Sequence, residues 1–521
     1  MSEPISFGKL DFKLVASMDE PGGRPEPETP FRILILGDFS GRANRGLSDS
    51  RALARRSPLL VDRDNLDEVI SRLGVEIHLA MGGPDRPLVP IRFSELEDFH
   101  PDRIFEQLEV FQALRETRQK LADPRTFSSA AAEVRGWEAT TAPAVASQRP
   151  PERPRVASPL SGLTTSGLLD EIMDRSEDRP SEARPSPGSS EWRAFLQEVV
   201  RPHLVPRADP RQAELVAALD ASIAELMRTI LHDPDFQALE AAWRGADFLV
   251  SRLETDAQLR LYLFDLSQAE LRADLVATDD LRSTGTYRLL VEQTVATPGA
   301  EPWAVLVGNY TFDHTLEDAE LLGRMAKIAR GAGAPFIAAA HSHLVGCESL
   351  AETPDPDDWR GPTEAKGTPA WEELRKIPEA SYLALALPRF LLRLPYGRET
   401  EPIERFDLEE TADAFNHEHY LWGNPALASA CLLAQGFSLH GWDLRPGAIK
   451  DIQGLPLHVY RIQHESRTKP CAEVLLTERA AEVILDHGLM PLLSFRDRDT
   501  VRVARFQSLA DPVTRLAGRW T

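Results

Sequence analysis

Cysteine is scarce in this sequence. Its 521 residues include three cysteines, Cys347, Cys431 and Cys471, and no two of them form a CxxC pair. Zinc, disulfide and redox frameworks are built from clustered cysteines, so the spacing argues against all three and favours a reducing compartment.

Long apolar runs are also missing. No stretch reaches the roughly 20 apolar residues that a bilayer-spanning helix needs. Residues 1–18 mix charged and apolar side chains and contain no hydrophobic segment typical of a signal peptide. We therefore expect no membrane insertion and a cytoplasmic location.

Positive charge is in deficit. The chain carries 59 Lys and Arg against 81 Asp and Glu, which gives a formal net charge of −22. Nucleic-acid binding depends on a basic surface that releases counterions from the phosphates, and acidic membranes attract basic surfaces for the same reason. The balance excludes nucleic acid as an expected partner.

Signatures of catalysis are absent too. The turn at 37–42 follows an apolar strand, but no GxxxxGK[ST] or GxGxxG pattern accompanies it, so a tight turn is a better interpretation than a phosphate loop. His341-Ser342-His343 and His417-Glu418-His419 each bring two imidazoles together. A metal could bridge either pair, yet the sequence identifies no third ligand, which favours surface or core histidines. We predict no enzyme, no cofactor and no metal.

Residues 1–123 have the pattern of a small α/β module. Leu10, Phe12 and Leu14 alternate with charged residues, which predicts a half-buried strand. The apolar run at 31–36 predicts a buried strand. Residues 59–61 lead into a helix predicted at 64–73. Further strands are predicted at 75–79 and 88–93, and a second helix, with Pro101 in its first turn, has an apolar face over 104–121.

A change of composition follows. Residues 124–190 contain nine prolines and few aromatic residues, which predicts a disordered linker with a short amphipathic segment at 167–173. Residues 191–521 predict a larger α/β domain with a mixed sheet, because apolar strands alternate with helical patterns. These strands are predicted at 259–264, 303–308, 336–340 and 382–387.

Two aromatic-rich stretches of the larger domain stand out. Arg389 and Arg393 lie in an apolar segment between two prolines, and Tyr420 and Trp422 precede a turn. Arginines among bulky apolar residues are typical of buried or interfacial ion pairs. We predict that these four residues belong to an assembly interface, with core packing as the alternative.

The same segments resemble the two subunits of the type VI secretion contractile sheath. The small subunit is matched by 33–42 (ILILGDFSGR), 61–70 and 91–104. The large subunit is matched, in order, by 230–245, 307–312 (VGNYTF), 334–340, 387–397 (LPRFLLRLPYG), 420–424 (YLWGN) and 473–482. The two subunits are normally separate chains, and here the proline-rich stretch joins them.

The resemblance implies a structural protomer of a helical tube that surrounds an inner tube and contracts to drive it into a target cell. It implies other sheath subunits, the inner tube protein, baseplate components and an AAA+ unfoldase as partners. The unfoldase reads a short N-terminal helix of the large subunit. Leu168, Leu169 and Ile172 match that helix in position and character.

The chain departs from the family at one end. The large subunit continues well past the element matching 473–482, with C-terminal strands that pair with neighbouring protomers. The strand with Leu10, Phe12 and Leu14 is a candidate for one side of such an exchange. The alternative to a protomer is therefore an accessory, cap or adaptor protein that docks to true sheath without polymerising by itself.

Overall fold

The structure is a computed structural model that describes residues 25–48, 53, 55–79, 88–123, 125–139, 212–359, 368–411, 416–462 and 465–520. Two predicted segments lie outside these residues. One is the strand with Leu10, Phe12 and Leu14, and the other is the amphipathic segment with Leu168, Leu169 and Ile172.

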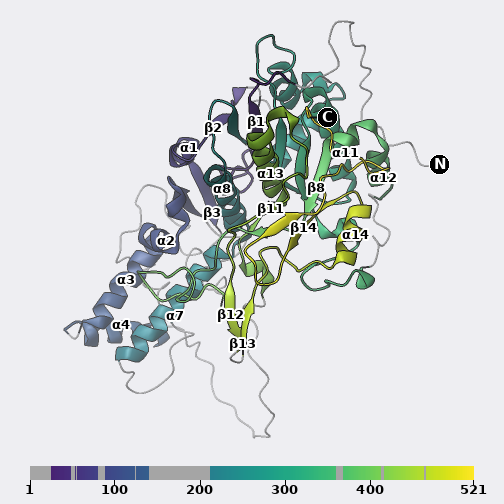
Figure 1. Ribbon diagram of the computed structural model, residues 1–521. Helices are drawn as coiled ribbons and strands as arrows, with labels where there is room; N and C mark the ends of the chain where they lie inside the picture. The colour runs from purple at the N-terminus through teal and green to yellow at the C-terminus, as the bar shows by residue number, and fades with distance from the viewer. Residues whose placement is uncertain are drawn as a thin grey trace, which may run out of the picture.

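A nine-stranded mixed sheet forms the centre of the molecule (Figure 1), with strand order β11-β15-β14-β8-β7-β6-β1-β5-β2. Six of its strands run parallel, and β2, β11 and β15 are paired antiparallel towards the two edges. The parallel strands are β1 (Phe31–Gly37), β5 (Leu259–Asp265), β6 (Val305–Phe312), β7 (Phe336–Ala340), β8 (Leu383–Leu387) and β14 (Met490–Ser494). The others are β2 (Leu59–Val61), β11 (Asp451–Ile452) and β15 (Val501–Val503).

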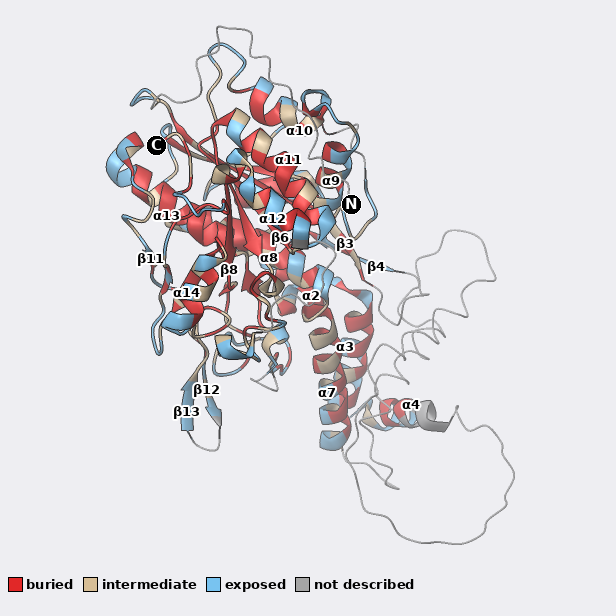
Figure 2. Ribbon diagram, turned by 90° about the vertical axis from the view of Figure 1, so that its right-hand side faces the viewer, coloured by how far each residue is buried: buried red, intermediate tan, exposed pale blue. Residues whose placement is uncertain are grey.

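Helices cover both faces of the sheet, which is the arrangement that buried parallel strands require. On one face lie α8 (Pro234–Arg252) and α13 (Pro425–His440). On the other face lie α9 (Gln268–Val276), α11 (Leu316–Ala332), α12 (Thr368–Lys376) and α14 (Glu478–Asp486). Figure 2 shows the buried residues concentrated in these layers.

Strand β1 comes from the first module but occupies an interior position of this sheet. It pairs in parallel with β5 on one side and with β6 on the other. Ile33 and Ile35 point into the core under α8 and α13, and Leu34 and Leu36 point into the opposite core. Because side chains alternate between faces along a strand, one apolar run fills both layers. The two predicted α/β regions therefore share one sheet.

The rest of the first module packs beside that sheet. It comprises α1 (Leu66–Leu73), the antiparallel hairpin of β3 (Val75–Leu79) and β4 (Val89–Phe93), α2 (Pro101–Gln107) and α3 (Glu109–Ala122). The helix predicted at 104–121 is two helices, because Leu108 adopts an extended backbone and buries its side chain between them.

A three-helix arm projects from the body (Figures 1 and 2). It consists of α3, α4 (Phe127–Ala139) and α7 (Gln212–Leu231), and the Arg118 guanidinium binds Asp220 across it with an Nε–Oδ1 distance of 2.5 Å. Helix α4 corrects one expectation, since residues 127–139 were assigned to the linker. This stretch contains no proline and is rich in alanine, which favours a helix.

A few further short elements lie outside the central sheet. They are α10 (Gly285–Tyr287), the pair β9 (Phe390–Leu391) and β10 (Trp422–Gly423), and the hairpin of β12 (Val459–Ile462) and β13 (Glu465–Thr468). Among the described residues, no helix has both the length and the apolarity to cross a membrane. The mixed α/β fold, with a small N-terminal region and a larger region containing a mixed sheet, is as predicted.

Candidate functional site

The turn at 37–42, the junction turn, connects the first module to the second through several hydrogen bonds. Asp265, at the end of β5, accepts hydrogen bonds from the amides of Phe39 (2.9 Å) and Ser40 (3.0 Å) and from the Ser40 hydroxyl (2.7 Å). The Trp243 indole donates to the Phe39 carbonyl at 2.7 Å. A phosphate loop would direct such backbone N–H groups at a ligand. Here they already donate hydrogen bonds to the Asp265 carboxylate. Burial raises the pKa of Asp265, and these donors partly oppose that rise.

A second contact of the junction turn is an ion pair in the interior. Arg42 binds Glu270 through two bonds, with Nε–Oε2 at 2.8 Å and Nη2–Oε1 at 2.9 Å. Arg56 also binds this carboxylate, with Nη2–Oε1 at 2.6 Å and Nη1–Oε2 at 3.3 Å. Glu270 is fully buried. The hydrogen bond to Glu270 is the main reason that the pKa of Arg42 is raised, so Arg42 stays charged at any physiological pH.

The glycine of the junction turn is required by its surroundings. Gly41 has a φ of +76°, and a Cβ built there would lie 2.3 Å from the Glu76 carbonyl oxygen. A left-handed backbone angle combined with this close approach excludes a larger side chain without rearrangement. The motif GDFSGR therefore serves as a structural joint between β1 and the β3 hairpin.

A buried ion cluster, formed by Glu240, Arg244, Arg393 and Glu410, lies near the base of α8. Arg393 Nε binds Glu240 Oε1 at 2.7 Å, and its Nη1 binds Glu410 Oε2 at 2.7 Å. Arg244 Nε binds Glu240 Oε1 at 2.6 Å. Glu240, Glu410 and Arg393 are 0%, 1% and 8% exposed. Burial alone would lower the pKa of Arg393, but the two carboxylates more than offset this and raise it well above its usual value.

Three of the four predicted interface residues are internal. Arg393 belongs to the buried ion cluster. Tyr420 and Trp422 are 2% and 6% exposed; the Tyr420 hydroxyl is 2.8 Å from His458 Nδ1, and the Trp422 indole donates to the His417 carbonyl at 2.9 Å. These side chains have almost no surface to offer a neighbouring protomer, which favours the core-packing alternative for them.

Arg389 is the fourth predicted interface residue and keeps 40% of its side chain exposed. Its Nε binds Glu473 Oε1 at 2.7 Å, and its backbone amide binds Glu473 Oε2 at 2.8 Å. Burial would raise the pKa of Glu473, but His417 and Arg389 reverse this and lower it to about 2. Arg389 remains a candidate for an assembly contact.

The two histidine pairs have different surroundings. His417 Nε2 lies 3.1 Å from Glu473 Oε1, whereas the His419 ring stacks on His232 with centroids 3.8 Å apart. The two imidazoles of this pair therefore contact different partners and do not face a common point. His341 and His343 instead converge on Asp313, a residue that the sequence pattern did not connect with them.

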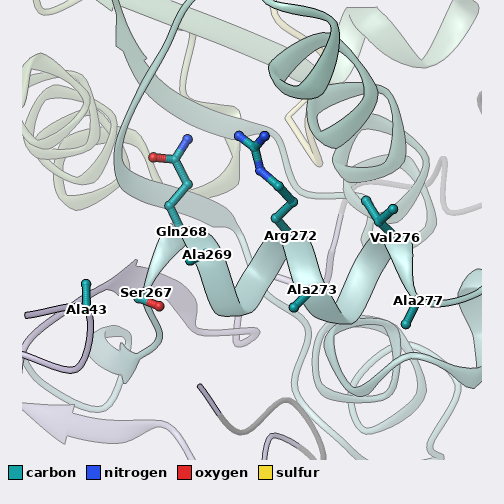
Figure 3. A pocket seen from close by; sticks show the side chains of 8 residues that line it. All are labelled: Ala43, Ser267, Gln268, Ala269, Arg272, Ala273, Val276 and Ala277. Carbon is teal, nitrogen blue, oxygen red and sulfur yellow. The ribbon is translucent and has the colours of Figure 1, made fainter. Parts of the chain in front are cut away.

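Helix α9 lines a wide depression of about 750 Å³ (Figure 3). Four alanines and Val276 form most of its wall. Its polar groups have partners: Arg272 binds Asp318 at 2.6 Å, the Gln268 amide donates to the Thr311 carbonyl at 3.3 Å, and Ser267 caps α9. The depression therefore brings together no acid–base or nucleophilic pair.

Sequence reasoning missed the acidic members of these clusters. One signal was available for Glu240, which is spaced four residues from Phe236 and three from Trp243, on the apolar face of its helix. A carboxylate in that position needs a buried cation as a partner. Asp265 carries no comparable local signal, and Glu270 shows locally only its capping box with Ser267, because the first-module partners of both carboxylates are more than 200 residues away.

Comparison with known proteins identifies the class to which this architecture belongs. Residues 213–510 match the VipB family, described as EvpB and the tail sheath N-terminal domain, and residues 16–135 match the VipA family of type VI secretion systems. The first match covers more than half of the chain. The chain therefore belongs to the tail-sheath family of type VI secretion systems, whose members are structural proteins, and it carries both sheath modules in one polypeptide.

One curated relative shows the likeness in detail. The chain is 36% identical over 307 residues to the type VI secretion system sheath protein TssC1 of Pseudomonas aeruginosa (strain PAO1). The aligned region is 57% of this chain and 61% of the relative. The chain thus spans less than two thirds of that relative's length.

We predict an acid-sensitive contact at His232. Its Nε2 atom is buried without a hydrogen-bond partner among the described residues. Burial, His419, Arg393 and Arg228 lower its pKa from 6.5 to about 3. Between these values the unfolded chain binds more protons than the folded chain, so stability falls as the pH falls from about 6.5 towards 3.

The substitution His232→Phe, which keeps a ring but cannot titrate, should flatten this part of the pH profile of the urea midpoint. The control His440→Gln alters an exposed histidine at the end of α13 and should leave the profile unchanged. Equal slopes in wild type and His232→Phe would show that His232 is not the titrating group.

Proposed function

We propose that this chain is a fused protomer of a contractile type VI secretion sheath. In this proposal it forms part of a helical tube around an inner tube, and contraction of the tube drives the inner tube and its effectors into a target cell. The observation that carries the proposal is the position of β1. This strand, from the VipA-matching region, lies between β5 and β6 of the VipB-matching region.

The position of β1 supports a protomer because both modules complete one sheet within a single chain. The contacts of the junction turn with Asp265, Glu270 and Trp243 hold the modules in one arrangement. A rigid unit of this kind can be repeated by one heterologous contact, and such repetition without closure produces a helical tube.

The proposed partners are other sheath subunits, the inner tube protein, baseplate components and an AAA+ unfoldase, and the proposed location is the cytoplasm. Within the proposal, Leu168, Leu169 and Ile172 form the segment that the unfoldase reads. The strand with Leu10, Phe12 and Leu14, together with Arg389, contacts neighbouring protomers. Family membership supports these assignments, and they stay predictions.

Negative-stain electron microscopy of the purified protein, alone and mixed with its neighbouring tail proteins, tests the proposal. Tubes formed by the protein alone are the expected result. Small particles that only add density to the ends or walls of preformed sheath would replace the proposal with the accessory function. Small particles that bind no sheath would overturn both.

A further inference from the structure

Three potential metal ligands converge where two parallel strands end. Strands β6 and β7 are neighbours whose last residues, Phe312 and Ala340, are in register. Asp313 directly follows β6, and His341 and His343 follow β7. One ligand atom from each of the three lies within 4.8 Å of the other two, and all three side chains are half-buried. The parallel pairing thus brings the Asp313 carboxylate close to two imidazoles that lie 28 and 30 positions further along the sequence.

We propose that Asp313, His341 and His343 form a binding site for a divalent transition-metal ion, with zinc as the best fit. The inference is independent of the proposed sheath function. A tetrahedral zinc site has ligand distances of about 2.0–2.2 Å, which places the ligand atoms about 3.3–3.6 Å from one another. The ligand atoms of the cluster lie within 4.8 Å of one another, which exceeds that spacing by no more than about 1.5 Å.

The carboxylate is held in place by groups around it. Asp313 Oδ1 accepts a hydrogen bond from the backbone amide of His314 at 2.7 Å, and the same oxygen lies 2.6 Å from His314 Nδ1. The backbone amide of Asp313 donates to Asp318 Oδ2 at 2.9 Å. These contacts fix one carboxylate oxygen and leave Oδ2 directed at His343. Supporting contacts of this type orient the ligands of known metal sites.

Each imidazole presents a suitable nitrogen. His343 Nδ1 lies 2.7 Å from Asp313 Oδ2, and a metal ion between them would replace the shared proton. His341 Nδ1 accepts a long hydrogen bond, 3.3 Å, from the His343 amide, and a metal ion bound at this nitrogen would replace that bond. The two rings lie 4.0 Å apart. Three protein ligands leave a fourth position for water, as in zinc sites with an open coordination position.

The ligand chemistry selects the metal. Two imidazoles and one carboxylate suit Zn²⁺, Co²⁺ or Ni²⁺, whereas Mg²⁺ and Ca²⁺ prefer oxygen ligands. The cysteines do not compete for the metal, because Cys347, Cys431 and Cys471 are all buried. The role that follows is a cross-link between the loops after β6 and β7.

The test is a titration of the full chain, stripped of metal by chelation, with Zn²⁺ alone by calorimetry and with Co²⁺ alone by visible absorption. We expect one Zn²⁺ per chain, and visible Co²⁺ bands of a tetrahedral or five-coordinate site. Asp313→Asn and His343→Gln keep the shape and a hydrogen-bonding group, and each should weaken binding by at least about tenfold. The matched control His440→Gln, at an exposed histidine, should bind as wild type does.

Far-UV circular dichroism in chelator establishes that each variant is folded, and His341→Gln replaces any variant that is not. Zinc should raise the melting temperature of wild type and of His440→Gln only. The proposal is overturned if wild type binds no Zn²⁺ at one equivalent, or if the cluster variants bind as tightly as wild type. Equal competition by Mg²⁺ would also overturn it, since it would indicate adventitious binding to the acidic surface.

Discussion

Replacement of Arg393 by alanine should destabilise the protein by about 3–5 kcal/mol, because it removes the cation that two buried carboxylates share. Glu240 and Glu410 are almost completely inaccessible, and Arg393 makes four hydrogen bonds to them, between 2.7 and 3.1 Å long. Arg244 binds Glu240 as well, whereas no ion pair between Arg244 and Glu410 is found among the described residues. Denaturant unfolding, followed by fluorescence, measures the loss.

The control for this prediction is Arg398→Ala. Arg398 pairs with Asp407, but both side chains are more than half exposed. Exposed pairs contribute about 0–1 kcal/mol, so this variant should unfold almost as wild type does. Combining Arg393→Met with Glu240→Gln and Glu410→Gln removes all three charges and should recover part of the loss. Similar stabilities of Arg393→Ala and Arg398→Ala would contradict the assignment of a buried ion cluster.

The second large effect concerns the two modules. When residues 191–521 are produced without residues 1–140, we expect an insoluble or non-cooperatively unfolding product. Its sheet would lack β1 and β2, so β5 would lose both of its neighbours, β6 would expose an unpaired edge, and both cores would lose the Ile33–Leu36 side chains. Co-production of residues 1–140 with residues 191–521 as separate chains should restore a soluble complex in which the two chains co-purify.

A matched pair of substitutions in residues 1–140 distinguishes insertion of β1 between β5 and β6 from a loose association of the two chains. Ile33→Asp places a charge in the core and should abolish co-purification. Leu60→Asp lies on the edge strand β2, where its side chain is 47% exposed, and should leave co-purification intact. A soluble 191–521 piece with a cooperative unfolding transition would show that β1 is dispensable.

Local patterns predicted most of the elements of this fold but not the way they assemble. The strand at 31–36 was recognisable because it is apolar on both faces, which is typical of a central strand. Its partners could not be predicted, since pairing with β5 spans more than 220 residues and leaves no local period. Helix α4 was hidden because the proline count was averaged over the whole of 124–190.

The candidate sites were predictable only in part, because they too depend on contacts between residues that are distant in the sequence. The sequence displayed His341 and His343, but Asp313 joins them only through the parallel pairing of β6 with β7. The aromatic and arginine-rich segments were recognised, yet interfaces and cores use the same residue types. Burial, which decides between the two alternatives, depends on tertiary structure.

The parallel flanks of β1 also determine how the chain resists mechanical load. Both neighbours of β1 run in its own direction, so a pull along the strand from the residues preceding Phe31 loads two rows of hydrogen bonds in shear. In shear, the bonds of a row must break together, whereas a strand peeled from an edge loses them one at a time. The three-residue edge strand β2 has one such row, to β5, and should therefore yield at a lower force than β1, which has two.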